Sequence, residues 1–339
     1  TTYAWIPADV ITTKLEAMKR LIPGVLGLLL FATACCDDNN DNNSDGDIEQ
    51  TLVTPALTAR ISEQASQETP FTGILEVFPC VSGSSDFFGN YFNGKLSVFS
   101  GFYTIVQGEV FGENNRMIHL PIGTYNMVYW GTPKHEEPID NTPEMSEPGI
   151  TEGVDLSTLY FSLRPYGDGT YKPVFDLVHA VAETQVGTEN LRASLYRVSA
   201  GLIVNLTQKD NSPFPDNIEE IKVQIGSIAE KLNFYTAEPV NQTKTVRFGL
   251  TRSEDGLTMS NPTVMLFPSA PNPTLEIYIT LTDNSIHKLS QTLNSSLSAN
   301  TLLTLNIVIG RIISEGNPEG FTITDWNEQS ETIEFPDFE

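Results

Sequence analysis

Apolar side chains recur at every second position through several stretches of this chain, and no other feature of the sequence constrains the fold as much. In the clearest stretch, residues 275–281, leucine and isoleucine alternate with Glu, Tyr and Thr. A period of two is typical of a β-strand that buries one face and exposes the other. The same alternation occurs over residues 196–206, 221–225 and 303–309. The sequence therefore predicts a core built from strands.

Three earlier stretches, residues 74–78, 96–106 and 125–130, are rich in the β-branched and aromatic residues that strands favour. Gly, Pro, Asn and Asp residues lie between the stretches and predict tight turns. Only residues 188–193 and 227–232 suit a turn or two of helix. Many short strands with few short helices predict an all-β chain of β-sandwich architecture.

The N-terminal part of the sequence has the pattern of a targeting segment. A basic pair at residues 19–20 precedes an apolar run over 21–34, which is too short to span a bilayer. The exit at residues 32–35 resembles a bacterial lipobox, although Ala32 departs from its pattern, and this predicts a diacylglyceryl group on Cys35. An ordinary secretory cleavage is the alternative. We expect residues 18–34 to be a lipoprotein signal peptide and residues 1–17 to be a mis-assigned start.

An acidic, polar stretch follows Cys35 and predicts a flexible solvated tether over residues 35–49. Residues 41–48 match part of a calcium loop, but Leu52 stands where such a loop needs a bidentate Glu. The tether is therefore a poor calcium site. Acidic residues directly behind a lipidated cysteine also resemble the surface-export signal of lipoproteins from some Gram-negative anaerobes. That resemblance implies the outer face of the outer membrane.

The formal net charge of the chain is −24, which disfavours nucleic acid and anionic lipid headgroups as partners. Any membrane contact is therefore expected to come from the lipid on Cys35. The other two cysteines are Cys36 and Cys80. One bridge between them stays open, but three cysteines make no disulfide scaffold. The core must hold by apolar burial.

The chain after the tether is long enough for one large or two ordinary domains. A Gly/Thr/Glu stretch near residue 187 suits a boundary. We therefore predict an N-terminal sandwich over residues 50–187 and a C-terminal sandwich over residues 188–339. Residues 132–152 are rich in Pro and acidic residues and are expected to form a long exposed loop within the first domain.

Signals of enzyme chemistry are weak in this sequence. It contains no nucleophile elbow and no Gly-rich phosphate loop after a strand. Pairs of acidic residues occur by chance in so acidic a chain, so they identify no catalytic pair. The four histidines have no metal-ligand spacing and lie at His119, His135, His179 and His287. We predict no catalytic residue, no metal site and no cofactor.

Four short motifs carry more information than the composition. Each contains a turn or loop residue beside an apolar or aromatic strand, and together they cover residues 120–131, 195–200, 298–309 and 321–326. In this order, behind a lipobox-like exit, they resemble the fimbrillin superfamily. Its members are the lipoprotein-derived subunits and anchors of type V pili in oral and gut anaerobes of the Bacteroidales type. Two departures are Ser199 beside Ala200 and Leu302 beside Leu303, where the family favours small apolar and aromatic residues.

The resemblance implies two transthyretin-like β-sandwich domains in tandem. It also implies that a protease cuts polymerising subunits after an arginine in the first strand, and that a strand of the next subunit fills the vacated groove. Arg60 is the candidate cleavage site. The candidate donor strand is residues 331–335, with Thr332, Ile333 and Phe335; the alternative is that this strand pairs within its own domain. An uncut Arg60 would leave the lipid attached and suit an anchor or accessory protein.

The sequence thus predicts a non-enzymatic lipoprotein at the surface of the outer membrane, in a fimbrium. We expect it to act as a pilus subunit or anchor, to join other subunits by strand addition, and to support adhesion to an unidentified host or bacterial ligand. The alternative is a carbohydrate-binding lipoprotein of a glycan-uptake system, with exposed Trp130, Tyr160 or Tyr166 as sugar platforms. A secreted hydrolase is a distant third reading.

Overall fold

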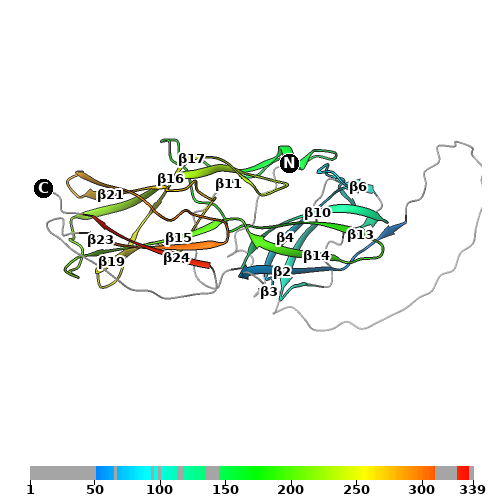
Figure 1. Cartoon of the computed structure of the whole chain (residues 1–339), viewed down its shortest axis with the longest axis horizontal. Coiled ribbons are helices and arrows are strands. Elements are labelled where there is room, and N and C mark those ends of the chain that lie inside the picture. The colour runs from blue at the N-terminus through cyan, green and yellow to red at the C-terminus, as the bar shows by residue number, and fades with distance from the viewer. Residues whose placement is uncertain are drawn as a thin grey trace, which may run out of the picture. The chain divides into compact units, whose positions relative to one another are not determined.

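A computed structural model of the chain describes residues 51–64, 67–92, 95–97, 101–112, 118–134, 145–309 and 327–335, the last of these by their backbone (Figure 1). The chain divides into two units, 1–51 and 52–339, and the second is the subject below. Its described residues form strands and turns, with a single 3₁₀ turn, η1 (Leu156–Thr158). The predicted all-β fold is confirmed. No helix of the described residues has the length and apolar character needed to cross a membrane.

The first large sheet has eight strands in the order β14-β13-β10-β4-β7-β8-β2-β3. Because β14 also pairs with β2, the ring closes, and we call it the closed sheet. The β2–β14 pairing is parallel, whereas the other pairings of this sheet are antiparallel. Its strands are β2 (Leu57–Gln64), β3 (Gln67–Pro70), β4 (Gly73–Val81), β7 (Gly101–Val106), β8 (Glu109–Val110), β10 (Gly123–Pro133), β13 (Val178–Val186) and β14 (Leu191–Arg197).

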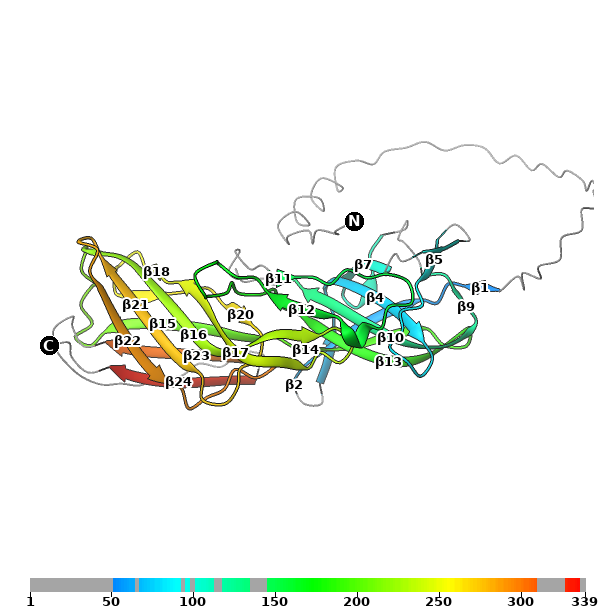
Figure 2. The same ribbon diagram turned by 90° about the horizontal axis from the view of Figure 1, so that it is seen from above.

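Two further sheets of six strands face each other as layers, and we call them the paired sheets (Figures 1 and 2). One layer contains β11 (Met145–Ser146), β12 (Tyr160–Leu163), β16 (Ile218–Asn233), β17 (Pro239–Gly249), β21 (Thr274–Leu281) and β22 (Ile286–Thr292). The other contains β15 (Ala200–Gln208), β18 (Thr251–Arg252), β19 (Thr258–Ser260), β20 (Val264–Leu266), β23 (Thr301–Ile309) and β24 (Asn327–Phe335). Two small ladders join β1 (Leu52–Val53) to β9 (Leu120–Pro121) and β5 (Asn90–Phe92) to β6 (Lys95–Ser97).

Two hydrophobic cores fill these sheets, and the alternation along β10 explains how one strand serves both. Met127 and Tyr129 point into the closed sheet and belong to its core. Val128 and Trp130 point the opposite way and pack into the core of the paired sheets. A strand with both faces buried is expected to lack polar alternation, and this is the reason that residues 127–130 of the aromatic motif, Met-Val-Tyr-Trp, carry no charged or amide side chain.

The predicted alternating strand over residues 196–206 is two strands, β14 and β15, separated at residues 198–199. In β14 the odd-numbered side chains are buried, as at Leu195, whereas in β15 the even-numbered side chains Leu202 and Val204 are buried. The phase changes where the chain leaves the closed sheet for the paired sheets. The prediction that Tyr196 points inward is therefore wrong, and this side chain is 42% exposed.

Both predicted helical turns are also wrong. Residues 227–232 lie within β16, where the register against β17 shifts between Ile225 and Ile228 and Ser227 has a φ of 59°. Of residues 188–193, the first three form the turn before β14 and the last three lie within β14. In both places pairing with neighbouring strands outweighs the weak local preference for helix.

The predicted boundary at residue 187 falls in the turn between β13 and β14, which share the closed sheet. The loop predicted over residues 132–152 also contains a strand, β11, which pairs with β12, and β12 pairs in turn with β16. Residues 135–144 of this loop lie outside the described part of the chain. We propose that residues 198–199, where the chain passes from β14 of the closed sheet to β15 of the paired sheets, mark the boundary instead. The number of domains stays a prediction.

Candidate assembly surface

Strand β2 connects the N-terminal unit to the closed sheet and carries Arg60. Its side chains Leu57, Ala59 and Ile61 alternate into the core, while Arg60 is exposed. Arg60 pairs with Ser194 of β14 on one edge and with Pro70 of β3 on the other. The peptide bond after Arg60 therefore lies in a strand that has partners on both edges. A protease needs an extended, unpaired segment, so this bond is protected while β2 stays in place.

Strand β2 ends close to the start of β23. The Asn300 side-chain amide donates a hydrogen bond to the Ser62 carbonyl at 3.4 Å. Strand β2 runs parallel to β14, and β23 runs parallel to β15, which follows β14 in the chain. The chain therefore has one continuous segment, β14 followed by β15, whose first half pairs with β2 and whose second half pairs with β23.

The predicted donor residues Thr332, Ile333 and Phe335 lie in β24, which forms the last strand of its sheet. They pair in parallel with Asn306, Ile307 and Ile309 of β23, the pairing within one chain that the sequence left open. In Figure 2 the strand follows β23 along its length. A strand at a sheet edge with one neighbour is the kind of element that can be exchanged between chains. The predicted lipid site, Cys35, lies outside the described residues.

An aromatic cluster joins the closed sheet to the paired sheets. Trp130 of β10 is fully buried, its indole N–H donates to the Phe234 carbonyl at 2.8 Å, and its ring lies 4.8 Å from that of Phe161. The ring centroid of His179 lies 4.4 Å from that of Trp130. Trp130 is therefore a junction residue and not the exposed sugar platform that the alternative function required.

A buried ion pair lies beside this junction. The Arg197 Nε donates to both carboxylate oxygens of Asp176, at 2.9 and 3.0 Å, and the two residues are 2% and 0% exposed. The Ser199 hydroxyl donates to the same carboxylate at 2.8 Å and accepts from the Leu177 N–H at 3.1 Å. These residues lie where the chain passes between the sheets. The sequence analysis includes Arg197 in the motif at residues 195–200 but does not identify Asp176. The sequence feature that could have identified it is an acidic residue that stands alone in the mostly apolar stretch 174–180.

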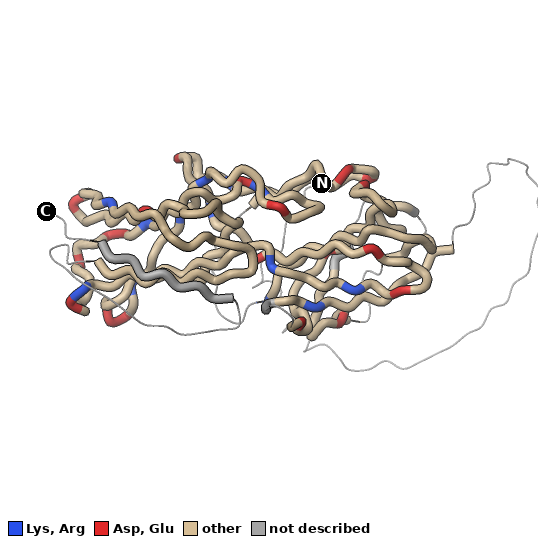
Figure 3. Tube along the Cα trace, viewed as in Figure 1, with Lys and Arg blue, Asp and Glu red and all other residues tan. Residues whose placement is uncertain are grey.

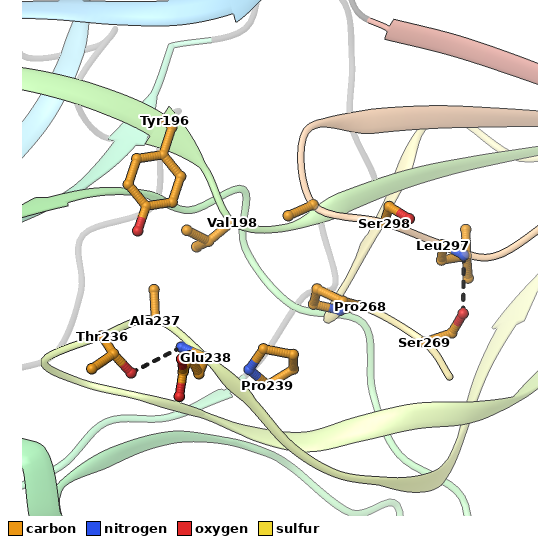
Figure 4. Close-up of a pocket in the computed structure, with 11 residues that line it drawn as sticks. Tyr196, Val198, Thr236, Ala237, Glu238, Pro239, Pro268, Ser269, Leu297 and Ser298 are labelled. Carbon is orange, nitrogen blue, oxygen red and sulfur yellow. Dashed lines mark hydrogen bonds between the residues drawn. The ribbon is translucent and has the colours of Figure 1, made fainter. Parts of the chain in front are cut away.

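Beside the junction lies a pocket of about 350 Å³ (Figure 4). One wall is Tyr196 and Val198, at the end of β14. The other walls come from three loops, at residues 236–239, 268–269 and 297–299. The Ser269 hydroxyl accepts a hydrogen bond from the Leu297 N–H at 2.9 Å and ties two of these loops together. The lining is mostly apolar, so the pocket suits an apolar side chain better than a charged one.

Two tyrosines, the half-buried Tyr160 and the exposed Tyr166, are covered by cations. The Lys231 ammonium lies 3.9 Å from the ring centroid of Tyr160, and the Arg247 guanidinium lies 4.3 Å from that of Tyr166. Such contacts are typical of cation–π packing at a surface. Figure 3 shows basic positions interspersed with acidic ones over both sheet systems. A sugar would have to displace these cations, so the arrangement gives the carbohydrate-binding alternative no support.

Histidine, cysteine and acidic side chains, which could serve catalysis or metal binding, are dispersed over the described part of the chain and form no cluster there. His119 bonds the Thr54 hydroxyl at 3.0 Å, and burial lowers the pKa of His179 to about 3. Cys80 is a buried free thiol, and its burial raises its pKa to about 12, so a bridge to Cys36 would require the core to open. No group of three or more His, Cys, Asp or Glu residues could hold a metal ion among the residues described; His135 lies outside them.

One carboxyl group predicts a dependence of stability on pH. Burial, and the neighbouring Glu76, raise the pKa of Glu147 to about 7, against a smaller opposing effect of Arg164. Because the pKa is raised on folding, the protonated form stabilises the fold at low pH, and this stabilisation is lost as the pH rises through about 7. We expect this group to lower the melting temperature between about pH 4.5 and pH 7, the unfolded and folded pKa values, and Glu147→Gln to remove that contribution.

The measurement is thermal unfolding followed by circular dichroism at a series of pH values. Glu109→Gln, at an exposed position, is the matched control and should keep the slope of the unmodified protein. Equal slopes for the unmodified protein and Glu147→Gln would show that Glu147 is not the group responsible.

The fold defines a class: an all-β protein with two buried hydrophobic cores and a strand, β24, at the edge of a sheet. The chain belongs to the family of fimbrillin-A associated anchor proteins Mfa1 and Mfa2, whose family model matches residues 45–332. This match confirms the predicted resemblance to fimbrillins. None of the proteins with curated functions matches the chain.

The solved structures that match the chain include two proteins of low sequence identity to it. The fimbrial anchor protein Mfa2 from Porphyromonas gingivalis is 12% identical, with a TM-score of 0.42 over 73% of this chain and 100% of that chain. A protein from Bacteroides ovatus described as an adhesin is 11% identical, with a TM-score of 0.44 over 75% of this chain and 88% of that chain. The family assignment rests on the family model, which covers residues 45–332.

Proposed function

We propose that this chain is a fimbrial anchor protein that stays uncut at Arg60, keeps a lipid on Cys35, and holds other pilus subunits at the outer membrane. The family supports a fimbrial role at the cell surface. The observation that carries the finer proposal is the position of β2. Arg60 has strand partners on both edges, which supports a chain that is not cut there and that keeps the segment bearing Cys35 joined to the folded protein.

The proposed contact with other subunits is strand addition. Strand β24 lies at a sheet edge and is held by β23. In strand addition, β24 would leave β23 and add to a sheet edge of another subunit. Backbone hydrogen bonds between β24 and that edge would supply the affinity, and the alternate side chains of β24 would supply the specificity. Ile333 and Phe335 are the apolar side chains at alternate positions that such a mechanism requires. No catalytic residue is needed for this step.

The experiment that tests the anchor role compares cells that carry the unmodified chain, Cys35→Ala or Arg60→Ala, and measures fimbriae on cells and in the medium. An anchor predicts that Cys35→Ala releases fimbriae into the medium and that Arg60→Ala behaves as the unmodified chain. A chain that is processed as a shaft subunit predicts the reverse, with Arg60→Ala blocking assembly. That second outcome would overturn the proposal.

Strand addition is tested separately with the double variant Ile333→Asp/Phe335→Asp. We expect it to reach the membrane in normal amounts but to lose the co-purifying pilus subunits, because a charge cannot enter an apolar pocket of the partner. Glu334→Ala, at the position between the two, is the matched control and should keep them. Retention of the subunits by the double variant would exclude β24 as the contact.

A further inference from the structure

The pocket beside the junction has no occupant among the described residues. It is large enough for one aromatic side chain, and its walls include the ring of Tyr196, two prolines and Leu297. Figure 4 shows the Tyr196 ring directed into the space between the loop at residues 236–239 and the turn at Ser298. Removing this much apolar lining from water is favourable, so the pocket fits an apolar or aromatic partner.

The register of β24 indicates which side chain is near. Asn327, the first residue of β24, pairs with Thr301, the first residue of β23. The residues directly before Thr301 include Leu297, Ser298 and Ala299, which line the pocket. Because the two strands are parallel, the chain enters β24 beside the segment that lines the pocket. The residue directly before Asn327 in the sequence is Trp326.

We propose that this pocket is the docking site for the side chain of Trp326 from the same chain. The sequence supports an apolar occupant, because Trp326 ends the motif at residues 321–326, which the assembly surface does not otherwise explain. An indole is amphipathic, and when buried its N–H usually finds an acceptor. Glu238 lines the pocket, and its carboxylate is the acceptor that we expect for this N–H. The inference does not depend on the anchor role.

The first test places the photo-crosslinking residue p-benzoylphenylalanine at position 326 of the full chain. The expected product is an intramolecular crosslink to the peptide with residues 236–239 or to that with residues 297–299, identified by mass spectrometry. The same residue at position 324, two places earlier, is the control and should give a several-fold lower yield of these products. Crosslinks to another part of the chain, to a second copy, or to no protein would each overturn the proposal.

The second test fills the pocket and reads the environment of the indole. Subtracting the emission of Trp326→Phe from that of the full chain gives the fluorescence of Trp326, which is expected to be blue-shifted. Ala299→Phe should shift it towards the red by displacing the indole. Ser290→Phe, an exposed position of β22 outside the pocket lining, is the matched control and should leave it unchanged. An emission of solvent-exposed indole in the unmodified chain would contradict the proposal.

Discussion

Replacement of Arg197 by Ala is expected to lower the free energy of unfolding by about 3–5 kcal/mol, the usual cost of removing one partner of a buried ion pair. The substitution leaves the Asp176 carboxylate in an interior where both residues are almost completely buried. The carboxylate must then stay charged without its cation or bind a proton, and both cost free energy. Urea unfolding followed by circular dichroism measures the loss.

Two controls separate this effect from the loss of any surface charge. Lys222→Ala removes an exposed pair with Glu220 and should cost less than about 1 kcal/mol. The double variant Asp176→Leu/Arg197→Met should be more stable than Arg197→Ala, because no buried charge remains unpaired. A cost for Arg197→Ala as small as that for Lys222→Ala would mean that the pair is not buried as described.

Replacement of Trp130 by Ala is expected to cost about 3–5 kcal/mol, because it removes a fully buried aromatic side chain and leaves a cavity. The ring contacts Phe161, Phe234 and His179, so the cavity would open between the closed sheet and the paired sheets. Trp130→Phe should cost less, since it keeps most of the ring but leaves the Phe234 carbonyl without the indole donor. Chemical unfolding curves of the two variants give both values.

The matched control for Trp130 is Tyr166→Ala, at an aromatic side chain that is 39% exposed. It should cost clearly less than Trp130→Ala, because little apolar area is lost from the interior. If the two variants had the same free energy of unfolding, the packing of Trp130 against Phe161, Phe234 and His179 would contribute little to the stability of the fold.

Much of the fold follows from the period of two in the sequence. The strands at residues 275–281 and 303–309 were predicted closely, because each has one buried face and the alternation there has no competing explanation. Tyr196 was misplaced because its strand changes the buried face within two residues, and a local pattern does not reveal which sheet covers each half. The stretch around Ser227 has a weak local preference for helix, and pairing of β16 with β17 outweighs it.

The candidate surface was predictable only in part. Arg60 and Phe335 were identified through a family resemblance, and the structure adds the pairing partners of their strands. The partnership of Arg197 with Asp176 joins residues that are separated by a whole hairpin, so no spacing rule finds it. The pocket at Tyr196 is made by four separate segments, and its shape depends on tertiary packing.

The central claim, that the segment bearing the lipid stays joined to the folded protein through β2, is tested most directly by the intact mass and N-terminal residue of protein extracted from the native outer membrane. The account predicts one species that begins at an acylated Cys35 and continues through Arg60. A species that begins at Ile61 and carries no lipid would contradict it.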